Sequence, residues 1–92
     1  MRIKILISKG VKDEISKLRE DEQERAKEML KKGLKVKFGH SYSLGETEAK
    51  DIYKTIMDNL SEMNKAFGNK IQQLNVEYSE KSGTIVVRRL KL

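Results

Sequence analysis

The amino-acid sequence alternates between two long stretches with helical spacing and several short stretches with strand spacing, and this order limits the folds it can adopt. From Val11 to Lys32, and again over residues 44–67, apolar residues recur every three or four positions, as in amphipathic helices. The spacing of the first stretch is interrupted at Glu22, which predicts a kink or a split near Arg19. Apolar and polar residues alternate, as in half-buried strands, over residues 1–8, 34–40, 70–78 and 84–92.

The predicted fold is an α/β two-layer sandwich of the α+β class, in the order β-α-β-α-β-β, with a four-stranded mixed sheet and two helices on one face. Right-handed crossovers would make the first three strands parallel, and the final hairpin is antiparallel. A chain of 92 residues is expected to form one domain, residues 1–92. Two helices cover only one face of such a sheet, so the other face contacts solvent or a partner. The last strand is apolar on both sides, which predicts a central position or a homodimer contact.

Positive charge is concentrated on the predicted strands. The formal net charge is +6, of which the strand segments contribute +8 and the helical segments −2. Such a separation of charge gives a surface that attracts polyanions.

Strand alternation assigns the charged residues to the face without helices, and the strand ends and the loop after the second strand add further polar groups. The candidate nucleic-acid-binding residues are Arg2, Lys4, Lys9, Lys35, Lys37, His40, Tyr42, Arg88 and Arg89. Cations of this kind neutralise phosphates. Aromatic rings that could stack on bases are scarce on this face, since Phe38 and Tyr78 have core parity and only Tyr42 is expected to be free. The pattern predicts backbone recognition with little sequence specificity.

Other classes of site have little support in the sequence. It contains no Cys and one His, so we expect no metal, no cofactor and no catalytic residue. The first apolar stretch is too short for a signal peptide or a membrane span, and we expect a cytoplasmic protein without membrane contact.

Three local stretches resemble the Alba chromatin-protein family and the related C-terminal domain of bacterial translation initiation factor 3. The first strand and basic loop are similar over residues 5–11, the second strand over Val36-Lys37 and its glycine-containing loop, and the final strand over residues 84–91. The resemblance implies a small basic nucleic-acid-binding domain in which Lys9, and Lys37 with the 39–42 loop, contact the backbone.

Three functions follow from these observations. The first is a non-enzymatic module that binds the DNA or RNA backbone. The second is a small interaction or inhibitor module, of the kind found in phages and mobile elements, whose basic sheet face docks on an acidic or nucleic-acid-binding protein. The third is a ribonuclease toxin that uses His40 or Tyr42, because the N-terminal third and the last hairpin resemble RelE/ParE-type toxins.

Overall fold

The computed structural model describes residues 1–90 and confirms the predicted α+β class and the four-stranded mixed sheet. It contains three helices, because the first predicted helix is divided in two. The elements in chain order are β1 (Arg2–Ile7), α1 (Lys9–Ser16), α2 (Glu20–Lys31), β2 (Ser41–Ser43), α3 (Glu46–Phe67), β3 (Leu74–Ser79) and β4 (Thr84–Arg89).

The strands lie in the order β2-β1-β4-β3, so β1 and β4 are neighbours in the middle of the sheet. These two strands are parallel, with Lys4 opposite Thr84. Strand β2 is antiparallel to β1, and β3 is antiparallel to β4. The prediction of a central final strand is confirmed, and the last two residues of that prediction, 91–92, lie outside the described part of the chain.

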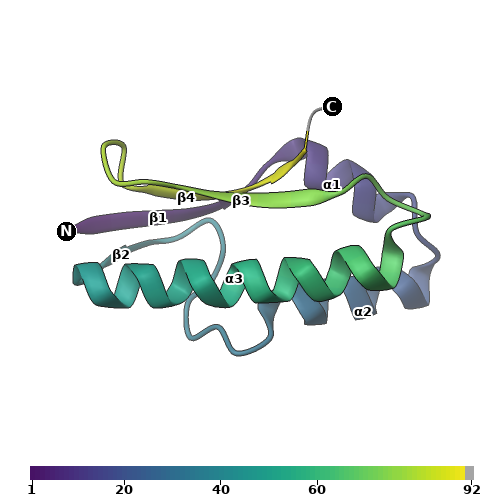
Figure 1. Ribbon diagram of the computed structural model, residues 1–92, viewed down its shortest axis with the longest axis horizontal. Helices are drawn as coiled ribbons and strands as arrows, with labels where there is room; N and C mark the ends of the chain where they lie inside the picture. The colour runs from purple at the N-terminus through teal and green to yellow at the C-terminus, as the bar shows by residue number, and fades with distance from the viewer. Residues whose placement is uncertain (91–92) are drawn as a thin grey trace.

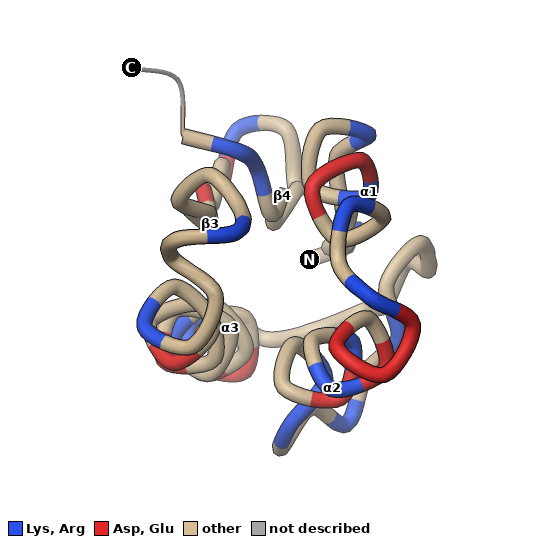
Figure 2. The backbone as a smooth tube through the Cα atoms, turned by 90° about the vertical axis from the view of Figure 1, so that its right-hand side faces the viewer, with Lys and Arg blue, Asp and Glu red and all other residues tan. Residues whose placement is uncertain are grey.

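Helices α2 and α3 pack against each other beneath the sheet, whereas α1 lies at the end of the sheet beside β4 (Figures 1 and 2). The core lies between the sheet and the helices. Its fully buried side chains include Ile3, Ile5, Ile85 and Val87 from the strands and Ile56 and Met63 from α3. Within residues 1–90, no helix lies over the opposite side of the sheet (Figure 1).

The division between α1 and α2 lies where the apolar spacing is interrupted. Glu22 is buried, and its Oε1 atom accepts hydrogen bonds from the backbone N–H of Arg19 at 3.4 Å and from its Nε at 3.2 Å. These bonds satisfy donors at the start of α2. The same carboxylate forms an ion pair with Lys70, which follows α3. Glu22, which interrupts the apolar spacing, therefore caps the start of α2 and links it to Lys70 after the end of α3.

The predicted strand over residues 34–40 is wrong in position. Residues 34–38 form no strand, and the chain joins the edge of β1 only from Gly39, whose N–H donates to the carbonyl of Ile5 at 2.6 Å. Leu34, Val36 and Phe38 are half-buried because the loop packs on the core. The alternation arises from this packing and not from sheet pairing.

The prediction that the first three strands are parallel is also wrong, since β2 and β3 both run antiparallel to β1. A single crossover helix between neighbouring strands produces parallel pairing. Here two helices, α1 and α2, lie between β1 and β2. The second helix reverses the path of the chain, and the following strand enters the sheet in the opposite direction.

Candidate anion-binding surface

The helix-free side of the sheet, which we call the open face, is formed by alternate residues of the strands. They are Arg2, Lys4 and Leu6 of β1, Ser41 and Ser43 of β2, Asn75, Glu77 and Ser79 of β3, and Thr84, Val86 and Arg88 of β4. Their neighbours in each of the longer strands point into the core, as the burial of Ile5, Val76 and Ile85 shows. Strand alternation and burial on one side thus fix the composition of the open face.

The charges of the open face lie toward its two ends. Arg2 and Lys4 lie on β1 toward the β3–β4 turn, and Arg88 lies at the other end, next to the start of α1. The one carboxylate among the eleven residues of the open face is Glu77, whose Oε2 atom is 3.1 Å from Nε of Arg88. All but two of the 14 acidic residues of the chain, Glu77 and Glu80, lie in helices. Figure 2 shows this concentration of acidic residues on the helices.

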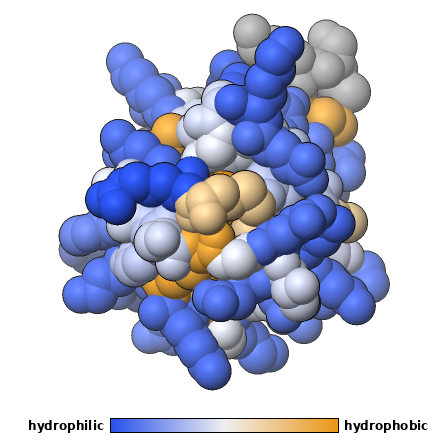
Figure 3. All heavy atoms as spheres, turned by 90° about the vertical axis from the view of Figure 1, so that its left-hand side faces the viewer, coloured by the Kyte–Doolittle hydropathy of each residue, from blue (hydrophilic) through white to orange (hydrophobic). Residues whose placement is uncertain are grey.

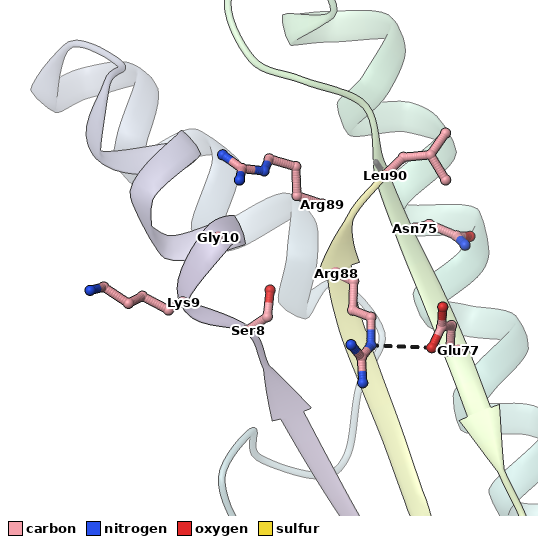
Figure 4. A pocket seen from close by; sticks show the side chains of 8 residues that line it. All are labelled: Ser8, Lys9, Gly10, Asn75, Glu77, Arg88, Arg89 and Leu90. Carbon is pink, nitrogen blue, oxygen red and sulfur yellow. Dashed lines mark ion pairs between the residues drawn. The ribbon is translucent and has the colours of Figure 1, made fainter. Parts of the chain in front are cut away.

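A shallow hollow of about 610 Å³ lies at the α1 end of the open face (Figure 4). Its lining residues come from the β1–α1 junction and from β3 and β4, and they are Ser8, Lys9, Gly10, Asn75, Glu77, Arg88, Arg89 and Leu90. The helix begins here with Ser8 as its N-cap, whose hydroxyl accepts a hydrogen bond from the N–H of Val11 at 3.4 Å. No acidic residue occupies the first turn of α1. The helix dipole and the cations together make this end of the sheet electropositive.

Arg89 also lines the hollow, but its side chain turns toward α1, whereas that of Arg88 turns toward Glu77 (Figure 4). Its Nη1 atom lies 3.5 Å from Oε1 of Glu14, and Nζ of Lys17 lies 3.1 Å from the other carboxylate oxygen. Glu14 is 1% exposed. Burial by itself raises the pKa of Glu14, but Lys17, the backbone N–H of Gln72 and Arg89 outweigh it and hold that pKa below the ordinary value of 4.5. Arg89 is therefore held by an internal carboxylate.

Glu14 was not predicted as an important residue, although the sequence contains a signal for it. It lies three residues after Val11 and four before Leu18, on the apolar side of its helix. A charged residue at such a position must be paired when the helix packs.

The structure brings together four of the nine predicted site residues: Arg2, Lys4 and Arg88 on the open face, and Lys9 at its edge. Lys35 instead lies near α3, in a hollow that it shares with Glu48 and Asp51. Lys37 belongs to the same loop. The loop runs on the helix side of the molecule (Figure 1). Both lysines were assigned to the open face only because residues 34–40 were predicted as a strand.

His40 and Tyr42 lie near the outer edge of β1, with ring centroids 6.5 Å apart. His40 is exposed, but Tyr42 is half-buried against the core and its hydroxyl accepts a hydrogen bond from the N–H of Lys37 at 2.9 Å. The expectation that Tyr42 is free is therefore wrong. Tyr78 packs against Tyr53 of α3, with ring centroids 6.0 Å apart, and none of the eleven open-face residues is aromatic.

The end of the molecule that carries the N-terminus is mostly hydrophilic, with a small apolar patch at its centre (Figure 3). Met1 is 51% exposed there, and its ammonium group donates a hydrogen bond to the carbonyl of Leu44 at 2.9 Å. Within residues 1–90, no group of three His, Asp or Glu side chains is arranged to hold a metal ion. None of the helices in this range has the length and apolar character required to cross a bilayer.

Comparisons with protein-family models, with curated proteins and with solved structures find no match to this chain. The resemblances to the Alba, initiation-factor and RelE/ParE families stay predictions.

Proposed function

We propose that this chain binds the phosphate backbone of nucleic acid across the open face, with little preference for base sequence. The observation that carries the proposal is the arrangement of Arg2, Lys4, Lys9 and Arg88 on and beside a sheet face with one carboxylate. Phosphates are bound by such cations, whereas bases are read by groove contacts or by stacking on aromatic rings. The absence of aromatic side chains from the open face favours the backbone as the ligand.

The spacing of these cations suits an extended polyanion. Arg2 and Lys9 are seven positions apart on β1 and its junction with α1, which corresponds to about 23 Å of strand. Lys4 lies between them, and Arg88 adds a cation beside Lys9. A track of three to four cations predicts a slope of about −2.7 to −3.6 for the logarithm of the duplex-DNA binding constant against the logarithm of salt concentration.

The proposal is tested by fluorescence anisotropy with short mixed-sequence single-stranded DNA, RNA and duplex DNA over a series of salt concentrations. Lys4→Glu/Lys9→Glu should weaken binding to all sequences alike and reduce the salt slope by about 2. Both lysines are exposed, and neither forms an ion pair within residues 1–90. The matched control is Lys54→Glu/Lys65→Glu on α3, which changes the net charge equally. Lack of binding at micromolar protein in low salt, or equal loss in both variants, would refute the proposal.

One observation favours a second candidate, docking of the open face on an acidic protein. Leu6 and Val86 are directly opposite each other in the sheet, and both are partly exposed at the centre of the open face. An apolar centre with a charged rim is the usual composition of a protein interface. Leu6→Ser/Val86→Thr separates the two candidates, because it should abolish protein docking and leave nucleic-acid affinity unchanged. The same variant tests a homodimer through this face by analytical centrifugation.

A further inference from the structure

The hydrogen bonds of the sheet show which backbone N–H and C=O groups of β3 point outward, away from β4. The N–H of Leu90 donates to the carbonyl of Gln73 at 2.8 Å, so the odd-numbered residues of β3 exchange hydrogen bonds with β4. The carbonyl of Val87, which lies opposite Val76, instead accepts from Ser8 on the other side of β4. Leu74, Val76 and Tyr78 therefore direct their N–H and C=O groups away from the sheet.

A side chain occupies the first of these three positions. Asn64 of α3 accepts a hydrogen bond from the N–H of Leu74 at 2.9 Å and donates to its carbonyl at 3.0 Å. Within residues 1–90, no group bonds to the outward N–H and C=O of Val76 and Tyr78. In the described part of the chain, β3 thus has a free edge at two residues, Val76 and Tyr78, each with an unbonded N–H and C=O group. The start of this edge, at Leu74, is closed by Asn64. Such an edge is a template for another strand.

A groove runs beside this edge, between β3 and α3. Its volume is about 190 Å³, and the side chains that line it include Met57, Leu60, Ser61, Asn64 and Val76. Met57 is 47% exposed and is one of only two large apolar side chains in residues 1–90 that are exposed to this degree. α3 runs alongside β3 in the opposite direction (Figure 1). A strand added at the edge would direct every second side chain toward Met57.

The rim of the groove on α3 carries two lysines and one carboxylate, that of Asp58, which lies three residues before Ser61. Lys54 lies three residues before Met57 and Lys65 four residues after Ser61, so each neighbours a groove residue on the helix surface. Both are exposed, and neither forms an ion pair within residues 1–90. They are 11 positions apart, about 16 Å along α3, which is the length of about five extended residues.

The charge of β3 argues against a second copy of this chain as the occupant. An antiparallel pair of β3 strands that uses the outward groups of Val76 and Tyr78 places Glu77 directly opposite Glu77 of the other copy. Like charges at directly opposite positions destabilise strand pairing. A partner with carboxylates near Lys54 and Lys65 avoids this repulsion.

We propose that the free edge of β3 binds an extended acidic segment of another protein by strand addition. The segment pairs with Val76 and Tyr78, places an apolar side chain in the groove beside Met57, and has carboxylates at both ends that reach Lys54 and Lys65. This mode takes affinity from main-chain hydrogen bonds and specificity from alternate side chains. The groove shares β3 and Asn75 with the open face but none of the cations Arg2, Lys4, Lys9 and Arg88, so each proposal can fail without the other.

Selection from a phage-displayed library of random peptides identifies the probe. Selected peptides should contain a central apolar residue flanked by Asp or Glu, and synthetic copies should bind with a stoichiometry of one. N-methylation of alternate peptide amides distinguishes strand addition from other binding modes. Methylation of the amides that face β3 should abolish binding, whereas methylation of the amides between them, which face away from β3, should leave binding unchanged. Hydrogen exchange at Val76 and Tyr78 should slow on binding. Selection of no peptide with this pattern, or equal effects of both methylation phases, would overturn the proposal.

Variants of the protein locate the site. Met57→Glu and Lys54→Glu/Lys65→Glu should each weaken binding of the selected peptide on the order of tenfold or more, since both change exposed side chains beside the edge. Lys4→Glu/Lys9→Glu is the control and should leave peptide affinity unchanged. Equal affinity in all three variants would contradict the assignment. If the protein forms concentration-dependent dimers that Met57→Glu dissociates, the occupant of the edge is a second copy of this chain and not an acidic segment, and the proposal is overturned.

Discussion

The side-chain amide of Asn64 bonds to both backbone polar groups of Leu74, at 2.9 and 3.0 Å, in the way that a neighbouring strand would. It joins the last third of α3 to the start of β3, ten residues later in the chain. Asn59, five residues earlier in α3, donates to the carbonyls of Leu30 and Lys32 and so ties the end of α2 to the same helix. Two asparagines thus fix α3 to both of its neighbours.

Asn64→Ala should lower the free energy of unfolding by about 1–3 kcal/mol, because two part-buried backbone groups lose their partners. Urea denaturation followed by circular dichroism measures this loss. Asn69→Ala is the matched control at an exposed position and should change stability by less than about 0.5 kcal/mol. An equal effect of both substitutions would show that the Asn64 amide contributes nothing specific.

Gly83→Ala should destabilise the protein more than Gly39→Ala. Both glycines have positive φ, +64° and +85°, so each substitution incurs the cost of left-handed backbone, about 1–2 kcal/mol. At Gly83 the new methyl group would also lie 2.6 Å from the carbonyl oxygen of Arg2, whereas nothing lies within 4 Å at Gly39. The difference between the two melting temperatures isolates this clash, and a difference near zero would contradict the close approach of the β3–β4 turn to β1.

Acidification should destabilise the fold through Glu14. Because its pKa is lower in the folded state than the ordinary value of 4.5, the ionised carboxylate contributes stability above that pH, and the contribution is lost as the pH falls through the folded-state pKa. Glu22, whose pKa Lys70 lowers, acts in the same direction. Glu14→Gln should reduce stability at neutral pH and make the loss below pH 4.5 shallower, as measured by urea denaturation at several pH values.

Asp13→Asn is the control for Glu14→Gln, since it removes an exposed carboxylate from the preceding position of α1. Its stability at neutral pH should stay close to that of the parent chain. If the two variants have the same stability at every pH, the ion pairs of Glu14 with Lys17 and Arg89 do not stabilise the fold.

Lys35→Glu/Lys37→Glu should reduce nucleic-acid affinity much less than Lys4→Glu/Lys9→Glu, although both variants change the net charge equally. The first pair lies in a loop on the helix side, and the second lies on and beside the open face. Anisotropy titrations at one low salt concentration measure the difference. If the first pair has the larger effect, binding takes place at the loop and not on the sheet.

The sequence predicted the elements whose spacing reflects burial on one side. The α3 helix, the division near Arg19 and the β3–β4 hairpin follow from periodicity and from turn residues. The loop over residues 34–40 was mistaken for a strand because packing on the core also produces alternate burial of Leu34, Val36 and Phe38. Which strands pair is decided by contacts between distant residues, and local spacing carries no information about them.

The candidate site was predicted only in part for the same reason. Lys4 and Arg88 could be assigned to the open face from strand parity, and the structure brings them to the same side of neighbouring strands. The ion pair of Arg89 with Glu14 and the hydrogen bonds of Asn64 with Leu74 each join side chains or backbone groups of two different secondary-structure elements. Such pairs are not visible in a single sequence.

The parallel pairing of β1 with β4 governs when this protein can fold during its synthesis. Lys4 pairs with Thr84, a residue made eighty positions later, and β1 has no other central partner. Until that point the ribosome has released the helices and a strand β1 whose one available partner is the three-residue β2, and these elements cannot bury their apolar surfaces in the final arrangement. Folding therefore waits for the last strand, and a ribosome that stalls before β4 leaves the hydrophobic side of β1 exposed to chaperones and proteases.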